Sequence, residues 1–290
     1  MSKKIDLSIV IVSYNTKELL RNCLNSIKKC QNEVSSEVFV SDNVSTDGSV
    51  EMLKRGFKWI NLIENNENLG FAKGNNVAKK YVKGKYILFL NPDTEIYKEV
   101  LKKSINYLKG NPDVGALGCK LVLPNGELDR DARRSFPSPW VTITHLLGLD
   151  KMFPKSKLFA KYWYGYLNPD KLHEVDSLQG AFFLTYKNIL DKIGWFDTDY
   201  FLNGEDIDLS WKIKNLGYKL IYFPEVKVLH VKKASKRSKK NIKQTLAGVN
   251  AMELFYKKHL WKKNNLVMNY LVLIGINVLK IIRLIKVYIS

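Results

Sequence analysis

Cysteine is scarce in this chain, which holds three in 290 residues: Cys23, Cys30 and Cys119. The three cannot all pair with one another, and their spacing matches no metal-binding pattern. Both facts argue against a disulfide-stapled secreted domain and favour a reducing compartment such as the cytoplasm. A hydrophobic content of 46% is enough for a sizeable core, in one large domain or two small ones.

Long uncharged apolar runs are also missing. The N-terminus, MSKKIDLSIVIVSYNT, has the outline of a signal peptide, but Asp6 interrupts it and the run Leu7–Val12 is too short, with no small-residue cleavage site after it. We therefore expect a first strand there. Near the C-terminus the longest uncharged run, Asn264–Leu279, has 16 residues with four asparagines. A membrane span needs roughly 20 apolar residues.

The common glycine-rich phosphate motifs are absent. The sequence has no GxGxxG and no Walker A lysine–hydroxyl pair, which argues against a dehydrogenase and an NTPase. The stretch SYNTKELLRN, after the first expected strand, has no glycine, so the loop expected of a nucleotidyltransferase is lacking. Residues 66–80, NENLGFAKGNNVAKK, do place glycines at a helix start, where backbone N–H groups can face phosphate.

Acidic residues are almost missing from the C-terminal part. Between Lys212 and Ser290 there are 18 lysines and arginines and two acids, a net charge of +16 out of +19 for the whole chain. A nearly neutral domain with a basic tail points to an anionic surface, either a membrane or a nucleic acid. A strongly apolar segment follows the charges, and no aromatic-rich RNA-binding motif is present, so we favour the membrane and expect no nucleic-acid partner.

What the chain does contain is a regular alternation of strand-like and helix-like segments. Ser8–Ser13 (SIVIVS) is apolar on both faces, as a central parallel strand should be. Further strands are expected at Glu37–Ser41, Trp59–Glu64 and Tyr86–Leu90, and helices at Thr16–Lys29, Ser49–Arg55, Gly70–Val82 and Thr245–Leu260. Such alternation predicts βαβ units and a doubly wound α/β fold with a mainly parallel, Rossmann-like sheet.

Polar clusters follow three of these strands, at the sheet edge where α/β proteins bind ligands. They are Ser13-Tyr14-Asn15, Asp42-Asn43 and Asn91-Pro92-Asp93. Oxygen ligands at a strand end suit Mg²⁺ or Mn²⁺ on a diphosphate, so Asp93 is a candidate metal ligand. The alternative is a turn whose acids face water, which suits Glu95. Beside Asp42, capping of the next helix by Asp47 or Ser49 is an equally good interpretation.

A second acidic cluster precedes a helix near residue 205. Glu205, Asp206 and Asp208 fill three of four positions, where the helix dipole accounts for one acid. An aspartate at such a helix start, beside aromatic side chains, suits a general base with a raised pKa. His230 ends an apolar strand and is either a structural histidine or a metal ligand.

Together and in this order, six stretches resemble the family 2 inverting glycosyltransferases, of the branch that includes rhamnosyltransferases. They are SIVIVSYN, SDNVSTDGS, NENLGFAKGNN, FLNPDTEI, QGAFFL and GWFDTDYFLNGEDIDLSWKIKNLGY, within about residues 6–235. The resemblance implies a GT-A fold. Its nucleotide-binding half would cover about residues 1–120 and its acceptor half about 121–235, with a basic helical tail over 236–290.

The resemblance also implies site residues. The nucleotide-sugar would contact Ser13, Tyr14, Asn15, Asp42, Asn43, Asn68, Phe71, Asn75, Asn91, Arg133 and Arg134. Asp93 matches the second acid of the family's metal-binding Asp-x-Asp motif, and His230 a histidine that reaches the metal. Asn91 replaces the first acid, but its carbonyl oxygen can still bind a hard cation or a ribose hydroxyl. Asp206 matches the catalytic base, with Glu205 beside it.

The implied activity is a single in-line displacement on a nucleotide-sugar, dependent on Mg²⁺ or Mn²⁺ and inverting at the anomeric carbon. The branch favours dTDP-rhamnose as donor, with UDP-sugars as runners-up, and a glycan or lipid-linked glycan as acceptor. The alternatives are a catalytically weak nucleotide-sugar-binding protein, which Asn91 supports, and a nucleic-acid-binding protein that uses the basic tail.

The tail itself is expected to be amphipathic. On a helical wheel Asn269, Asn277, Lys280 and Arg283 fall on one side and aliphatic residues on the other. This predicts an interfacial helix that holds the protein on the cytoplasmic face of the cell membrane. The other interpretation is a helix that packs on the protein's own body or on a second copy, which would make an oligomer.

Overall fold

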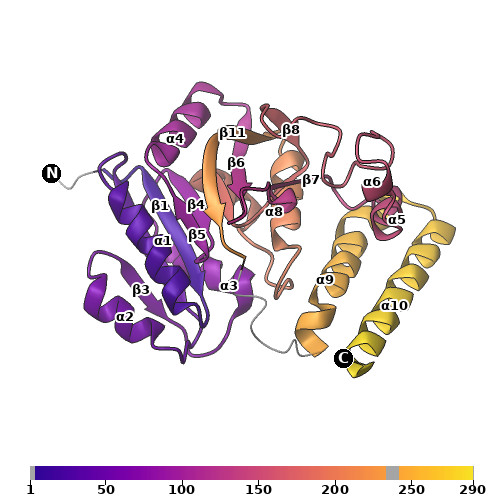
Figure 1. Ribbon diagram of the computed structural model, residues 1–290, viewed down its shortest axis with the longest axis horizontal. Coiled ribbons are helices and arrows are strands. Elements are labelled where there is room, and N and C mark those ends of the chain that lie inside the picture. Colours follow the sequence, from indigo (N-terminus) through magenta and orange to yellow (C-terminus); the bar gives the residue numbers. More distant parts are fainter. Residues whose placement is uncertain (1–3, 233–241, 290) are drawn as a thin grey trace.

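The structure is a computed structural model that describes residues 4–232 and 242–289 (Figure 1). Within these residues nine strands form one sheet in the order β3-β2-β1-β4-β10-β6-β11-β5, with β8 paired to β11, and β7 and β9 form a separate ribbon. The strands are β1 (Leu7–Ser13), β2 (Ser36–Asp42), β3 (Asn61–Glu64), β4 (Tyr86–Leu90), β5 (Thr94–Ile96), β6 (Val114–Val122), β7 (Arg133–Arg134), β8 (His173–Val175), β9 (Ser177–Leu178), β10 (Phe182–Tyr186) and β11 (Lys219–His230).

The first half of the sheet is parallel, as the alternation of segments predicts. β1 pairs with β2 and β4, and β2 with β3, all in parallel. All five residues of β4 are buried, as in a strand that is covered on both faces. The helices are α1 (Lys17–Lys29), α2 (Ser49–Gly56), α3 (Gly70–Asn76), α4 (Val100–Gly110), α5 (Pro139–Leu146), α6 (Leu149–Met152), α7 (Lys187–Ile193), α8 (Glu205–Asn215), α9 (Ile242–Phe255) and α10 (Leu266–Ile289).

Strand β10 joins the two halves of the sheet. It runs antiparallel between β4 and β6, and β6 in turn pairs in parallel with β11. The predicted α/β fold on one continuous sheet is confirmed. The boundary expected near residue 120 falls at the end of β6, and the one at residues 235 and 236 lies outside the described residues.

The helix expected over Gly70–Val82 is shorter than predicted. α3 ends at Asn76 and a 3-10 turn follows, because glycine and asparagine are poor helix formers and the Asn76 amide instead bonds the backbone of Phe196. Gly70 itself has φ of +72°, and a Cβ there would lie 2.4 Å from the carbonyl oxygen of Phe201. Only glycine fits where these two segments meet.

The tail packs on the body of the protein through a π-helical turn at Tyr256–Leu260. His259 Nε2 lies 2.6 Å from Asp208 Oδ1, and Lys258 pairs with Asp197. Phe255 is buried in a small cluster against α8. α9 therefore behaves as part of the globular fold, in agreement with the interpretation that the tail packs on the protein itself.

Helix α10 lies beside α9 (Figure 1). Most residues of its polar side have partners on α9 or next to it. Asn269 is 2% exposed and accepts a hydrogen bond from the Tyr256 hydroxyl. Lys280 pairs with Glu253, and Arg283 donates to a backbone carbonyl of α9. The interpretation in which the tail packs on the protein's own body holds for these three residues, because each has a partner on α9 or beside it.

The outer side of α10 is consequently apolar, with Asn277 as an exposed exception. The stretch Leu266–Ile285 is long and apolar enough, by length and composition, to cross a membrane, and 11% of its apolar window is buried. Its exposed large side chains are Leu266, Val267, Met268, Tyr270, Leu271, Ile274, Val278, Ile281, Ile282 and Ile285. The helical-wheel pattern underestimates how apolar the exposed surface of α10 is. It counts Lys280 and Arg283, whose charged groups turn inward in the fold.

Candidate active site

The polar clusters of β1, β2 and β4 come together at one edge of the sheet. Ser13 and Asp42 are register partners at the ends of β1 and β2. Asp42 is buried and accepts hydrogen bonds from the backbone N–H and the hydroxyl of Ser45, at 2.8 and 2.7 Å. Asn15 ties the first loop to this turn by accepting from Thr46 N–H. Tyr14 is 47% exposed, which leaves its ring accessible to a ligand.

The second wall comes from the start of α3. Asn68 is exposed and its Oδ1 accepts from Gly70 N–H, while the half-buried ring of Phe71 packs edge-on to Phe196. Asn43 and Asn75 are buried, and their amides bond the backbone of α3. These two asparagines therefore support the wall from behind, and their contact with a nucleotide-sugar stays a prediction.

The expected metal pair is also assembled. His230 Nε2 lies 3.3 Å from Asp93 Oδ1, and His230 Nδ1 lies 2.8 Å from Asp129 Oδ2. Burial opposes the charged imidazole, but the hydrogen bonds with Asp129 and Asp93 raise the pKa of His230 to about 9. Burial likewise opposes the Asp129 carboxylate, yet His230 and Lys232 lower the pKa of Asp129 to about 2. A cation bound at Asp93 would take the place of the proton on the His230 imidazole.

Asn91 contributes an unsatisfied oxygen to this region. Its Oδ1 is buried without a hydrogen-bond partner, which is unusual for an amide oxygen and suits a cation or a ligand hydroxyl. Within residues 4–232 and 242–289 no three His, Cys, Asp or Glu side chains gather closely enough to hold a metal by themselves. The protein therefore offers an incomplete ligand set, in keeping with a cation that also needs oxygens from a bound diphosphate.

The acids at the start of α8 divide into three roles. Asp206 Oδ2 lies 2.6 Å from Arg134 Nη2 and accepts from Gly180 N–H at 3.0 Å. Asp208 is buried and bonds His259, so it anchors the tail. Burial, and then the charge of Asp206, raise the pKa of Glu205 to about 8. The raised pKa in this turn therefore belongs to Glu205, whereas the expectation from the sequence is a raised pKa for an aspartate.

Several polar atoms around this turn are buried and lack a hydrogen-bond partner. They are Arg134 Nε, Gln179 Oε1, Glu205 Oε2 and Asp206 Oδ1. All four side chains line one pocket of about 340 Å³. Because buried polar atoms are normally satisfied, this concentration marks a site that awaits a polar ligand. Asp206 Oδ1 is the carboxylate oxygen available to take a proton there.

We expect Glu205→Gln to make the protein more heat-stable at pH 8 and no more stable near pH 4. The pKa of this carboxyl is about 4.5 in the unfolded chain and about 8 in the folded protein. Stability therefore falls as pH rises between these values, and the glutamine removes that loss. Tm measured from pH 4 to 8 should diverge by several degrees. Parallel Tm profiles for wild type and variant would contradict this pKa.

The two arginines of β7 do not share a role. They are successive residues of a strand, so their side chains point to opposite sides. Arg134 enters the pocket and pairs with Asp206. Arg133 instead donates Nη2 to the Leu167 carbonyl oxygen at 3.0 Å and lies 2.8 Å from His173. Arg133 thus has a structural role in the fold, and its contact with a diphosphate stays a prediction.

We expect Arg134→Lys to lower kcat on the order of 10- to 100-fold, because a lysine keeps the charge but not the planar fork that holds Asp206. Arg133→Gln is the matched control. It should leave kcat unchanged and reduce the free energy of unfolding by about 1.5–3 kcal/mol, since it loses charged hydrogen bonds. Initial rates and denaturant melts would check both variants. If Arg133→Gln lowered kcat and Arg134→Lys lowered only the stability, the roles of the two arginines would be exchanged.

The segment Gln179-Gly180-Ala181 links the two halves of the site. Asn91 N–H donates to the Ala181 carbonyl oxygen, and Gly180 N–H donates to Asp206. A Cβ at Gly180 would lie 3.2 Å from the Phe71 ring and 3.8 Å from Asp206 Cβ. Gly180 therefore sits between the donor wall and the acid of α8, which brings the predicted base to the predicted nucleotide pocket.

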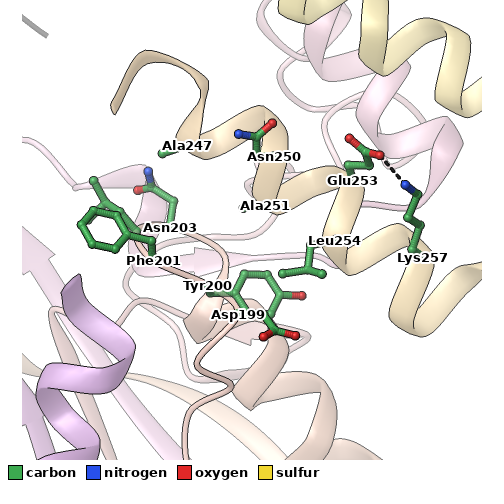
Figure 2. Close-up of a pocket in the computed structure, with 11 residues that line it drawn as sticks. Asp199, Tyr200, Phe201, Asn203, Ala247, Asn250, Ala251, Glu253, Leu254 and Lys257 are labelled. Atoms are coloured by element: carbon green, nitrogen blue, oxygen red, sulfur yellow. Dashed lines mark hydrogen bonds and ion pairs between the residues drawn. The ribbon is translucent and has the colours of Figure 1, made fainter. Parts of the chain in front are cut away.

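A neighbouring cavity of about 370 Å³ lies between the loop that precedes α8 and helix α9. Figure 2 shows Tyr200 and Asn203 on the loop side and Asn250 on the α9 side. Its acids are paired: Glu253 bonds Lys257, and Asp199 bonds a lysine of the tail. Asn203 also lines the pocket of Asp206, so this loop separates the two spaces. Among the described residues, buried polar atoms without a partner are more numerous in the Asp206 pocket, with four, than in this cavity, where Tyr200 Oη is one.

Sequence reasoning missed residues that only long-range contacts identify. Asp129 orients His230 from 101 residues away, and Tyr162 and Arg283 line the pocket of Asp206. The signal for Asp129 was its place in the acidic and basic stretch GELDRDARR, just before the arginine pair. No local signal marks Arg283 as a pocket residue.

Comparison with known proteins agrees with this geometry. The family model "Glycosyl transferase family 2" matches residues 8–194. The chain is 26% identical to the N-acetylglucosaminyl-diphospho-decaprenol L-rhamnosyltransferase of Mycobacterium tuberculosis over 238 residues, 78% of this chain and 76% of that protein. It is also 26% identical to rhamnosyltransferase WbbL of Escherichia coli K12 over 240 residues, 79% and 85% of the two chains.

A solved structure with a similar fold is the mannosyltransferase PcManGT of Pyrobaculum calidifontis, in complex with GDP-Man and Mn²⁺. It aligns with a TM-score of 0.61 and 18% identity, covering 91% of this chain and 66% of that one. The fold predicted from the six motifs is thus the observed one. Fold, site and family match agree, and the chain belongs to glycosyl transferase family 2, as a glycosyltransferase with the GT-A fold.

Proposed function

We propose that this glycosyltransferase moves a sugar from a nucleotide-sugar to a hydroxyl of a lipid-linked or polysaccharide acceptor in cell-surface glycan synthesis. Rhamnose from dTDP-rhamnose is the donor we favour, because two relatives that align over most of their length are rhamnosyltransferases. The observation that carries the proposal is Asp206, whose Oδ1 is unpartnered in a pocket that touches the donor wall through Gly180.

In this mechanism Asp206 Oδ1 takes the proton of the acceptor hydroxyl while that oxygen attacks the anomeric carbon. The new carbon–oxygen bond forms as the bond to the diphosphate breaks, and the electron pair leaves with the nucleoside diphosphate. A single displacement of this kind inverts the anomeric configuration. Arg134 and Gly180 N–H hold the other carboxylate oxygen, so Asp206 keeps one orientation throughout.

A divalent cation, Mg²⁺ or Mn²⁺, fits the residues at the strand ends. Asp93 and His230 would hold it, with Asn91 Oδ1 as a neutral oxygen ligand, since this oxygen is buried and unpartnered. When bound, the cation neutralises the charge that develops on the leaving diphosphate.

The donor is tested by thermal shift with a panel of nucleotide-sugars, with and without Mn²⁺ or Mg²⁺, followed by assay of nucleoside diphosphate release. We expect dTDP-rhamnose with a cation to give the largest Tm increase and to be turned over. Tm shifts without turnover on any acceptor would instead favour a binding protein. No shift with any nucleotide-sugar would overturn the proposal.

We also propose that the outer side of α10 rests on the cytoplasmic face of the membrane. Ile274 and Ile281 are 60% and 56% exposed on an aliphatic surface that a water-facing helix would not carry. The double variant Ile274→Asp/Ile281→Asp should bind phosphatidylglycerol-containing vesicles at least about tenfold more weakly in a flotation assay. Leu172→Asp, at an exposed leucine outside the tail, is the control, and equal binding of both would refute the proposal.

A further inference from the structure

An apolar groove of about 530 Å³ lies between α5 and the two helices of the tail. Ile143 and Leu146 of α5 form one wall, and Leu271 and Ile276 of α10 form the other. Gly275 leaves a gap between them, because a Cβ placed there meets no atom within 4 Å. The groove is thus built from side chains with almost no hydrogen-bonding capacity.

The rim of this groove is exposed and apolar. Ile143, Leu147, Leu271 and Val278 are 50%, 67%, 59% and 49% exposed. They lie on α5, just after it, and on α10, and all four line the groove. A soluble monomer rarely exposes such a contiguous surface without a ligand or a membrane to cover it.

The groove lies directly beside the catalytic pocket. Pro137, Thr142, Leu146 and Met252 line both spaces. On the catalytic side of this shared wall the lining turns polar and includes Arg283. The apolar groove and the pocket that holds the unpaired atoms around Asp206 are therefore neighbours with a shared wall.

Arg283 is a cation with spare hydrogen-bonding capacity in the lining of the catalytic pocket. Its Nη1 donates to the Thr245 carbonyl oxygen at 3.3 Å, and no acidic partner is found for it in the part of the chain that the structure describes. A guanidinium in this position matches a phosphate group.

We propose that the groove holds the hydrocarbon chain of a membrane-embedded acceptor lipid and that Arg283 binds the phosphate at its head. The sugar beyond that phosphate then lies in the pocket with its hydroxyl at Asp206. This inference rests on the proposed function, since it assigns the acceptor of that reaction. The occupant is an amphiphile because the groove is apolar, whereas the pocket beside it is polar and contains the Arg283 cation.

Chain-length dependence of binding tests the groove without any donor. Farnesyl phosphate and dimethylallyl phosphate, both below their aggregation concentrations, are the probes, and equilibrium dialysis against the full chain gives their Kd values. Each buried methylene adds about fourfold in affinity. We therefore expect farnesyl phosphate to bind at least on the order of 100-fold more tightly.

Two substitutions, at Gly275 and Asn277, test whether the gain in affinity with chain length arises in the groove. Gly275→Trp places an indole in the gap of the groove and should abolish the difference between the two probes. Asn277→Trp, on the exposed side of α10 and outside the groove, should keep it. Arg283→Gln should weaken both probes about tenfold and leave their ratio unchanged. Unchanged circular dichroism and Tm confirm that each variant is folded.

Equal affinities of the wild type for the two probes would overturn the proposal, as would a chain-length gain that survives in Gly275→Trp. A gain that appears only with dimerisation in sedimentation would place a second copy in the groove and overturn it too. Failure of the proposed function looks different: nucleotide-sugars are not turned over, whatever the chain length of the probe.

Discussion

Asp206→Asn lowers kcat by about 10²- to 10⁴-fold and leaves the affinity for nucleoside diphosphate nearly unchanged, if Asp206 is the general base. Asparagine has the same shape, and its amide oxygen can still accept from Gly180 N–H and Arg134. It cannot take the proton of the acceptor hydroxyl. The loss therefore falls on the chemical step, and single-turnover rates together with nucleotide titration would separate it from binding.

The matched control for this variant is Asp208→Asn, two residues along the same helix. Asp208 bonds His259 and Lys212 and lines none of the catalytic pocket. Its loss should loosen the tail and lower Tm, with a much smaller effect on the rate of the chemical step. Substantial turnover by Asp206→Asn would remove Asp206 from the role of base.

Asp93→Asn is the second variant with a large expected effect. The site offers one carboxylate and one imidazole close together, and Asn91 adds a neutral oxygen. Loss of the carboxylate should lower kcat/KM on the order of 100-fold and raise the Mn²⁺ concentration needed for half-maximal activity, because fewer charges hold the cation. Activity titrated against Mn²⁺ and Mg²⁺ gives both values.

Glu95→Gln serves as the control for Asp93→Asn. Glu95 pairs with Leu229 in the β5–β11 ladder, and the carboxylate within 4 Å of His230 in that loop is Asp93. The glutamine variant should keep the cation requirement of the wild type. If Glu95→Gln shifted the requirement as far as Asp93→Asn, the assignment of the cation to Asp93 and His230 would be wrong.

Local sequence predicted the fold and the gathering of polar residues at one edge of the sheet, because these depend on short-range patterns. Buried strands such as Tyr86–Leu90 show as continuous apolar runs, and polar residues directly after them must lie at one edge of a parallel sheet. The acids before α8 were visible for the same reason. Their separate roles were not, since Asp208 and Glu205 have the same side-chain chemistry as the base.

The order of strands and helices, the identity of the strand-end residues and the basic, apolar character of the tail all follow from the amino-acid sequence. Long-range packing was needed to show that Arg134 and not Arg133 faces Asp206, because the side of β7 that enters the pocket depends on its pairing with β9. The same holds for the inward polar side of α10, since Glu253, its ion-pair partner, lies on another helix. Which side of a helix such as α10 is exposed to water depends on how the whole molecule packs. The pattern of residues within that one helix does not determine it.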